Sequence, residues 1–480
     1  MQMMSQFLPV LPEITLAITA CVVLVVDLFV PPERRETTYV VALGALILTL
    51  VATFVGQPEG VRIIFNGSYI ADPMSFVLKI AVIVLTFFVF VYARPYLQGR
   101  GLFKGEFFAL GLFGLLGMLV MISGYSMLTI YLGLELLSLC QYALVAFNRD
   151  SPRASEAAMK YFVLGALASG MLLYGMSLIY GLTGSLDVLE IHNYLIRHGV
   201  DEVGVLLGLV FIVVGFAFKL GAVPFHAWVP DVYEGAPTAV ALYIGAAPKV
   251  AAFALFMRML VEGLGVLHED WQLMLAVLAV LSLVLGNLVA IAQSNLKRML
   301  GYSTISHVGF ILLGILAGTA QGYSAAMFYV IFYAFVSAGA FGMIILLSRR
   351  GLEAEQLDDF RGLNARSPWF ALMMLFMMFS MAGVPPFVGF YAKLSVLRAV
   401  IEQGGLGVGL AVVAVVFSVI GAFYYLRVVK LMYFDEPEET GAFQEGGGLR
   451  AALSVNGLAM LALGLYPALL MSWCIAAISW

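Results

Sequence analysis

Long apolar runs follow one another along the whole of this 480-residue chain. Hydrophobic residues make up 62% of the sequence and charged residues only 11%. A run of roughly 20 apolar residues is long enough to cross the hydrocarbon core of a bilayer as a helix. Because unpaired backbone groups are costly in lipid, a chain built from such runs folds as a bundle of spanning helices. The composition therefore excludes a soluble domain and predicts an all-α polytopic membrane protein.

We predict about 14 transmembrane helices, of which the seventh and the twelfth are interrupted by proline. The predicted spans are residues 9–30, 38–56, 71–93, 106–123, 126–147, 154–180, 204–229, 236–262, 272–293, 296–318, 321–348, 368–399, 406–433 and 451–474. Proline has no N–H, and its ring clashes with the carbonyl four residues back. At membrane depth such a break is tolerated only where it is buried in protein or lines a wet cavity. We therefore expect a functional site at the two broken spans.

Basic residues are distributed unevenly between the loops. Fifteen Lys and Arg residues lie in the loops that follow odd-numbered spans, and three (Arg62, Arg197 and Arg398) in the loops that follow even-numbered spans. Since cytoplasmic loops carry the excess of Lys and Arg, the odd loops are predicted to face the cytoplasm. With an even number of spans, both termini are then expected on the outer side.

Two further groups of side chains are expected near the membrane interfaces. Trp228, Trp271, Trp369 and Trp473 fall at or near span ends, as an interfacial aromatic belt requires. Lys79, Arg258 and Arg427 are expected to extend toward an interface along their apolar stems.

Three short sequences occur twice in the same order. GAVPF at 221–225 matches AGVPP at 382–386, AAMKYF at 157–162 matches AAMFYV at 325–330, and IGAAPK at 244–249 matches IGAFYY at 420–425. Each pair lies five spans apart, and an odd number of spans per unit turns the second copy upside down in the membrane. Inverted repeats with broken helices near the midplane are a transporter architecture.

The repeat predicts a division of the chain into four parts. We expect two inverted five-helix repeats, each with a broken helix, at residues 106–262 (spans 4–8) and 272–433 (spans 9–13). An N-terminal three-helix segment at 1–105 and a C-terminal helix at 451–480 flank them.

Eight ionisable residues within the predicted spans are the candidate catalytic residues for proton translocation. They are Glu135, Lys160, Lys219, His226, Lys249, Lys297, His307 and Lys393. A charged side chain at a span centre costs about 2.5–3.5 kcal/mol on insertion, so its presence there indicates a function. A lysine whose charge is disfavoured by burial and favoured by an approaching carboxylate can bind and release a proton near neutral pH. Histidine titrates there unaided. Bridged by water, these groups would form a proton wire.

Several of these residues also have a purely structural interpretation. Glu135 could form a structural ion pair with a lysine, Lys160 and His226 could lie at an interface, and Lys297 could be a charge that only sets topology. The helix breaks beside Lys219 and Lys393, and Pro248 before Lys249, favour a function for those three lysines. His307 is flanked by Ser303, Thr304 and Ser306, which suits a hydrated path.

Cofactor and metal chemistry finds no support in the sequence. Cys21, Cys140 and Cys474 lie singly in apolar segments, where we expect them to pack as small hydrophobic side chains. The sequence contains no glycine-rich dinucleotide fingerprint, no P-loop and no basic patch for nucleic acid. We therefore expect neither a cofactor nor a metal to bind this chain.

Three stretches resemble one family. KLGAVPFHAWVPDVYEGAPT at 219–238, NLKRMLGYSTISHVG at 295–309 and MAGVPPFVGFYAKLSVL at 381–397 are similar to the antiporter-like membrane subunits of proton-pumping NADH-quinone oxidoreductase, respiratory complex I. The resemblance covers nearly the whole chain. It implies that Glu135 pairs with Lys219, that Lys249 is the central connecting lysine, that His307 links to the second half, and that Lys393 is the exit lysine.

The resemblance also implies a setting. The chain would be a proton-translocating subunit of a bacterial inner-membrane translocase, with both termini in the periplasm. FMN, iron–sulfur clusters and quinone would bind partner subunits. The expected partners are other membrane and peripheral subunits of the same complex, including antiporter-like subunit M and small membrane subunits, and the lipid bilayer. An Mrp-type cation/proton antiporter subunit would have the same fold and is the alternative interpretation.

Overall fold

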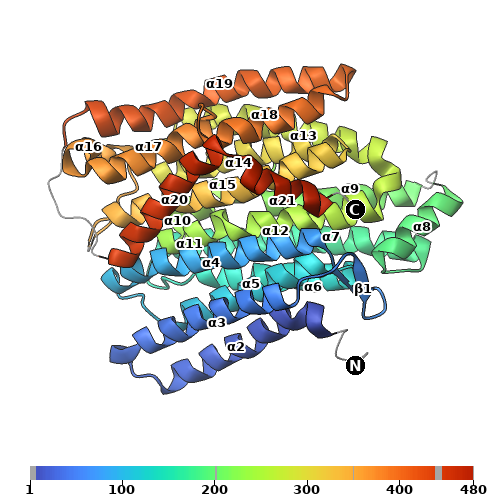
Figure 1. Ribbon diagram of the computed structural model, residues 1–480, viewed down its shortest axis with the longest axis horizontal. Coiled ribbons are helices and arrows are strands. Elements are labelled where there is room, and N and C mark those ends of the chain that lie inside the picture. Colours follow the sequence, from blue (N-terminus) through green and yellow to red (C-terminus); the bar gives the residue numbers. More distant parts are fainter. Residues whose placement is uncertain (1–6, 200–202, 350, 438–445, 479–480) are drawn as a thin grey trace.

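The computed structural model describes residues 7–199, 203–349, 351–437 and 446–478, and within them it is a bundle of helices with a short two-stranded hairpin (Figure 1). The helices are α2 (Leu11–Phe29), α3 (Glu36–Val55), α4 (Pro73–Gly99), α5 (Gly105–Ser123), α6 (Met127–Val145), α7 (Pro152–Thr183), α8 (Val188–His198), α9 (Val203–Leu220), α10 (Trp228–Gly235), α11 (Thr238–Gly245), α12 (Ala247–Phe256), α13 (His268–Ile291), α14 (Leu296–Leu316), α15 (Ala320–Leu347), α16 (Leu363–Arg366), α17 (Pro368–Ala382), α18 (Val388–Ile401), α19 (Gly405–Phe434), α20 (Gly447–Leu465) and α21 (Ala468–Ile478). Strands β1 (Arg62–Ile64) and β2 (Tyr69–Ala71) pair antiparallel, and a π-helix, η3 (Met257–Gly263), extends α12.

The predicted membrane architecture is confirmed. Within the described residues, 13 helices are long and apolar enough to cross a membrane. The remaining predicted span, 368–399, is the broken one, and it consists of the half-helices α17 and α18. The seventh predicted span is also broken, because α9 ends at Leu220 and helix resumes only in α10. The two ends of the chain, predicted to lie on the outer side, fall outside the described residues.

The helices lie side by side, with α2 and α3 at one edge of the bundle and α19 at the other (Figure 1). The most deeply buried spans are in the middle. The apolar window of Thr238–Gly263 is 100% buried and that of Ala320–Leu347 is 94% buried, whereas that of Gly405–Phe434 is only 28% buried. A helix that is apolar on all sides and also fully buried has no face left for lipid. The polar groups on these central helices are therefore shielded by protein.

Two expectations about interfacial side chains are wrong. Trp228 and Trp271 are 2% and 0% exposed, so they are core residues rather than members of an aromatic belt. Trp369 and Trp473, at 46% and 48%, are exposed as a belt residue would be. The expectation failed because a span end that is surrounded by other helices offers no route to the interface.

Lys79 and Arg258 are likewise buried in ion pairs and not exposed at an interface. Lys79 is 3% exposed and its ammonium lies 2.6 Å from a carboxylate oxygen of Glu13. Arg258 is 0% exposed and pairs with Asp72 at 2.8 Å and with Glu262 at 2.6 Å. Their acidic partners lie far away in the sequence or at a helix end, so the span sequence alone did not reveal them. Arg427 does reach a helix end, where it donates to the carbonyls of Ile291 and Gln293.

Candidate proton-transfer site

The first helix break leaves the Leu220 carbonyl without its normal partner. Gly221 has a φ of +80°, and the N–H groups of Gly221 and Ala222 both donate to the Ala217 carbonyl, at 2.9 and 2.8 Å. A side chain at Gly221 would lie 2.4 Å from Val229, so glycine is required at this turn. In an uninterrupted helix the Leu220 carbonyl would accept from residue 224, but that residue is a proline with no N–H.

A lysine supplies the missing donor. The Lys249 ammonium, on α12, donates to the Leu220 carbonyl at 2.6 Å. Lys249 is 2% exposed and lies 5.4 Å from the centre of the Trp228 ring. An orphaned carbonyl is a strong neutral acceptor for an ammonium, but it carries no full negative charge. The central lysine is therefore held at the break by a neutral acceptor, and no carboxylate of the described residues pairs with it.

The second break repeats this arrangement. Gly383 has a φ of +85°, and the N–H groups of Gly383 and Val384 both donate to the Phe379 carbonyl. In an uninterrupted helix the Ala382 carbonyl would accept from residue 386, but that residue is a proline with no N–H. The carbonyl accepts instead from the Lys393 ammonium at 3.0 Å. Lys393 also donates to Ser418 at 2.7 Å.

The geometry of the breaks corrects the alignment of the two repeats. Matching GAVPF with AGVPP pairs Gly221 with Ala382, whereas the structure pairs Gly221 with Gly383 and Pro224 with Pro386. The correspondence is therefore displaced by one residue from the one that the letters suggested. The boundaries of the two repeats stay a prediction.

Lys219 and Glu135 line one small cavity. Lys219 ends α9 and donates to Ser138 at 3.0 Å and to Gln141 at 3.1 Å. Glu135, one turn before Ser138 on α6, is hydrogen-bonded by Ser169 of α7. Among the described residues the two ionisable groups do not form a direct ion pair. The cavity measures about 20 Å³, which is room for about one water molecule.

His307 lies in a cluster of tyrosines. Its Nδ1 is 2.7 Å from the Tyr329 hydroxyl and its Nε2 is 3.0 Å from the Tyr425 hydroxyl. Its ring stacks on Tyr333, which donates to Thr304 at 2.7 Å. The Tyr329 ring stacks in turn on Phe310, over which the Lys393 ammonium lies at 5.2 Å. Since hydroxyls and imidazole both donate and accept, this cluster can pass a proton in either direction.

The sequence analysis did not identify these tyrosines as members of the site, nor did it place Trp228 beside the lysines. Tyr425 matches Lys249 when IGAFYY is aligned with IGAAPK, and Tyr329 lies in AAMFYV, so both positions were visible as repeats. A hydroxyl has no charge, however, and a search for buried ionisable residues passes over it. Trp228 stacks on Tyr161, whose hydroxyl donates to Gln141 beside Lys219, so it lies between the first two lysines.

Lys160 and Lys297 lie elsewhere, in a cluster of ion pairs on the face of the odd loops. Lys160 is exposed and pairs with Asp231 at 2.8 Å. Lys297 is buried, donates to the Ala236 carbonyl at 2.8 Å and lies 3.4 Å from Glu355. Burial alone would raise the pKa of Glu355, but Lys297 and Arg153 lower it by more, so it lies below its ordinary value. His226 is half-buried within the first break.

The five remaining candidates form what we call the polar row: Glu135, Lys219, Lys249, His307 and Lys393. They come from α6, α9, α12, α14 and α18, which lie between the α2–α3 edge of the bundle and α19 at the other edge in Figure 1. Lysines at two matching helix breaks, inside an all-α membrane bundle, define an antiporter-like membrane subunit. The described residues contain no group of three or more His, Cys, Asp and Glu side chains that could hold a metal ion.

Known proteins agree with this class. A family profile described as "NADH:quinone oxidoreductase/Mrp antiporter, TM" matches residues 124–421. "NADH-quinone oxidoreductase subunit N" of Thioalkalivibrio sulfidiphilus is 62% identical over 479 residues, covering 99% of this chain and 98% of the relative. The chain belongs to the NADH-quinone oxidoreductase subunit N family.

Solved structures share the fold. A chain of "Respiratory complex I from Thermus thermophilus with bound Aureothin" is 32% identical, with a TM-score of 0.82, and the match covers 97% of this chain and 100% of that one. A chain of the Mrp complex from Dietzia sp. gives a TM-score of 0.84 at 22% identity, over 99% of this chain and 97% of that one. The architecture is therefore common to both systems, and the sequence identity assigns the family.

Proposed function

We propose that this chain is a proton-translocating membrane subunit of a respiratory NADH:quinone oxidoreductase. Electron transfer from NADH to quinone would occur in partner subunits, and the polar row would carry protons through this one. The family supports membership of such a complex. The observation that carries the proton role is the set of three lysines at membrane depth, Lys219, Lys249 and Lys393, whose hydrogen bonds go to neutral acceptors.

Neutral acceptors make the charge of these lysines reversible. A buried ammonium beside a fixed carboxylate stays charged, because removing its proton would strand the carboxylate. A lysine that donates to a carbonyl or a hydroxyl can lose its proton and keep its remaining hydrogen bonds. The state of each lysine then depends on the charge of its neighbours.

Neighbouring charges in the row would control one another. Lys249 donates to the carbonyl of Leu220, the residue next to Lys219, so the two like charges would disfavour each other, while the Glu135 carboxylate, on the cavity that Lys219 also lines, would favour the charge of Lys219. Movement of Lys219 toward Glu135 would relieve Lys249, and movement away would drive the proton of Lys249 onward. The tyrosine cluster around His307 would receive that proton and deliver it to Lys393, at the second break.

Substitution of the lysines tests the proposal. We expect Lys219→Ala, Lys249→Ala and Lys393→Ala each to lower NADH-driven proton uptake into membrane vesicles, on the order of 100-fold if the step is general acid–base transfer. Lys430→Ala is the matched control. Lys430 lies near the end of α19, is exposed, and pairs with Asp435, the residue that follows the helix. Normal proton uptake in all three lysine variants would contradict the proposal that the polar row carries protons.

The finer setting belongs to the same proposal. We place the chain in a bacterial inner membrane with both termini in the periplasm, in contact with antiporter-like subunit M and small membrane subunits. FMN, iron–sulfur clusters and quinone would be held by partners. Purification in mild detergent tests this against the Mrp alternative, since co-purifying flavin and iron–sulfur subunits support the oxidoreductase. Sodium-coupled proton exchange by this chain without them would support the antiporter.

A further inference from the structure

A cavity of about 440 Å³ opens between α15, α18 and α21. Its volume falls in the range of small-molecule sites, roughly 300–1,000 Å³. The cavity exists because small side chains line it, among them Ala320, Ala325 and Ser395. It extends along α18 from Arg398, in the last turn of that helix, to Tyr391, which lies nearer the helix break.

The lining changes in polarity from one end to the other. At the end of Arg398, the first turn of α15 contributes Gln321. Deeper in, the walls are Leu394, Tyr391 and Met471, and the Tyr391 ring packs against Phe328. One end therefore offers a cation and an amide, and the rest of the lining is uncharged and, apart from the hydroxyls of Ser324, Ser395 and Tyr391, apolar.

Arg398 is available to a ligand. It pairs with Glu402 at 3.3 Å, but the two side chains are 73% and 49% exposed, and such surface pairs contribute little. A guanidinium binds a phosphate in preference to a single exposed carboxylate oxygen, because its planar fork matches the phosphate oxygens. Among the described residues that line the cavity, none is acidic.

We propose that this cavity is a binding site for an anionic phospholipid, with the phosphate at Arg398 and one acyl chain along α18. A cation at the mouth of a slot whose apolar side chains Leu394 and Ile475 are 48% and 53% exposed matches the order of groups in a lipid: charged head, then hydrocarbon. The lipid would brace α18, the half-helix that carries Lys393, against α15 and α21.

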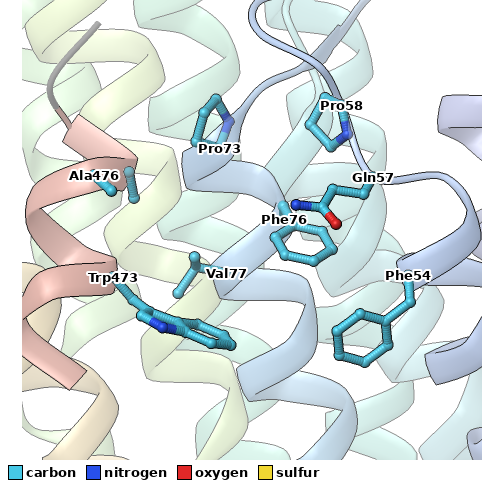
Figure 2. A pocket seen from close by; sticks show the side chains of 9 residues that line it. Phe54, Gln57, Pro58, Pro73, Phe76, Val77, Trp473 and Ala476 are labelled. Carbon is cyan, nitrogen blue, oxygen red and sulfur yellow. The ribbon is translucent and has the colours of Figure 1, made fainter. Parts of the chain in front are cut away.

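A second cavity on the other side of α21 makes a useful contrast. It measures about 380 Å³ and lies between α3, α4 and α21, where Phe54, Phe76 and Trp473 surround it (Figure 2). Gln57 is the polar side chain there, and none of the described lining residues is charged. That cavity offers apolar surface without a cation, so it has no means of selecting an anionic head group.

The test uses the intact membrane complex in vesicles that contain a photoactivatable phosphatidylglycerol or a phosphatidylcholine with the same diazirine-bearing acyl chain. After illumination, the labelled peptides are mapped by mass spectrometry. We expect phosphatidylglycerol to label the cavity walls on α15, α18 and α21 about fivefold more than phosphatidylcholine, which is the expected effect of one basic residue near the membrane surface. Labelling around Trp473 should show no such preference.

Four variants sharpen the result. Arg398→Gln should abolish the preference and Arg398→Lys should keep it. Arg62→Gln is the matched control, since Arg62 is another arginine of the even loops paired with a nearby glutamate, Glu59, at 3.2 Å, and it should change nothing. Ser395→Phe should fill the cavity and lower labelling by both lipids; if that variant does not assemble, the two Arg398 variants still decide the matter. Equal labelling by both lipids with no effect of Arg398→Gln, or cross-linking of the cavity walls to a partner subunit instead of lipid, would overturn the proposal.

Discussion

Lys79 and Lys249 are both buried within membrane spans, at 3% and 2% exposure, but their surroundings differ. Lys79 lies 2.6 Å from the Glu13 carboxylate and donates to the Tyr69 hydroxyl at 2.7 Å. Lys249 donates to the Leu220 carbonyl and has another lysine, Lys219, as its charged neighbour. Burial alone therefore does not mark a proton carrier. The distinguishing feature is whether the counter-charge is fixed.

Two fixed pairs within the spans, Glu13–Lys79 and Asp72–Arg258, lie near the loops that follow even-numbered spans. Glu13 begins α2, Asp72 caps α4, and Arg258 lies in the π-helix at the end of the eighth span. Both pairs join segments that are distant in sequence, which suits a structural role. The polar row lies on the central helices and beside the breaks, where a backbone carbonyl replaces the carboxylate. The difference separates the charges that hold the bundle together from those that can change.

The largest effect is expected at Arg258. Arg258→Gln would leave the Asp72 and Glu262 carboxylates buried without their cation, and breaking a buried pair in this way typically costs about 3–5 kcal/mol. We therefore expect little assembled complex, measured as the amount of this chain recovered with its partners. Arg258→Lys should recover part of that amount. Normal assembly of Arg258→Gln would show that this group does not hold the bundle together.

The paired lysines provide the sharpest contrast. Lys79→Met should reduce assembly, because Glu13 loses its cation, by somewhat less than Arg258→Gln, which strands two carboxylates. Lys249→Met should assemble normally or better, because it removes a buried charge without stranding another, and yet it should pump poorly. Thermal denaturation of the complex and proton uptake in vesicles measure the two properties. The same loss of assembly in both variants would contradict the distinction.

The spans and the two breaks could be predicted from sequence because hydropathy and proline act locally. The choice between a fixed and a changeable charge could not, because it depends on partners brought together by packing. Glu13 and Lys79 form an ion pair although 66 positions separate them in the sequence. The Leu220 carbonyl accepts from Lys249 at a helix break, and the alignment of the two repeats from their sequences was wrong there by one residue. Trp228 failed for the same reason, since a tryptophan near a span end is interfacial only if that end faces lipid.

Tyr425 tests whether the second half of the row works through hydroxyls. Tyr425→Phe removes the hydroxyl that contacts His307 and Ser303 but keeps the ring, so we expect a stability loss of only about 1 kcal/mol. Proton uptake should fall by roughly tenfold or more if the hydroxyl takes part in proton transfer. Tyr424→Phe is the matched control, because the Tyr424 hydroxyl donates to Asn287 and, among the described residues, does not hydrogen-bond His307. An equal decrease in both variants would indicate a packing effect.

The smallest effect is expected from Glu355, a fixed counter-charge outside the spans that pairs with Arg153 at 2.7 Å and lies near Lys297. Burial raises the pKa of this carboxyl, but Lys297 and Arg153 lower it by more, so the folded pKa is below the ordinary value of 4.5. A carboxylate with a lowered folded pKa stabilises the folded state fully above its unfolded pKa, and this stabilisation is lost as the pH falls through the folded pKa.

Glu355→Gln should therefore lower the thermal midpoint of the complex at about pH 7, and the difference from the parent should shrink as the pH falls below about 4.5. Glu402→Gln is the control, because its partner Arg398 is well exposed and the pair should contribute little at any pH. A difference that stays constant or widens toward acid would mean that Glu355 does not act as a fixed ion-pair partner. Its charge would then not be fixed by Arg153 and Lys297, and the contrast between fixed and changeable charges would not extend to the odd-loop face.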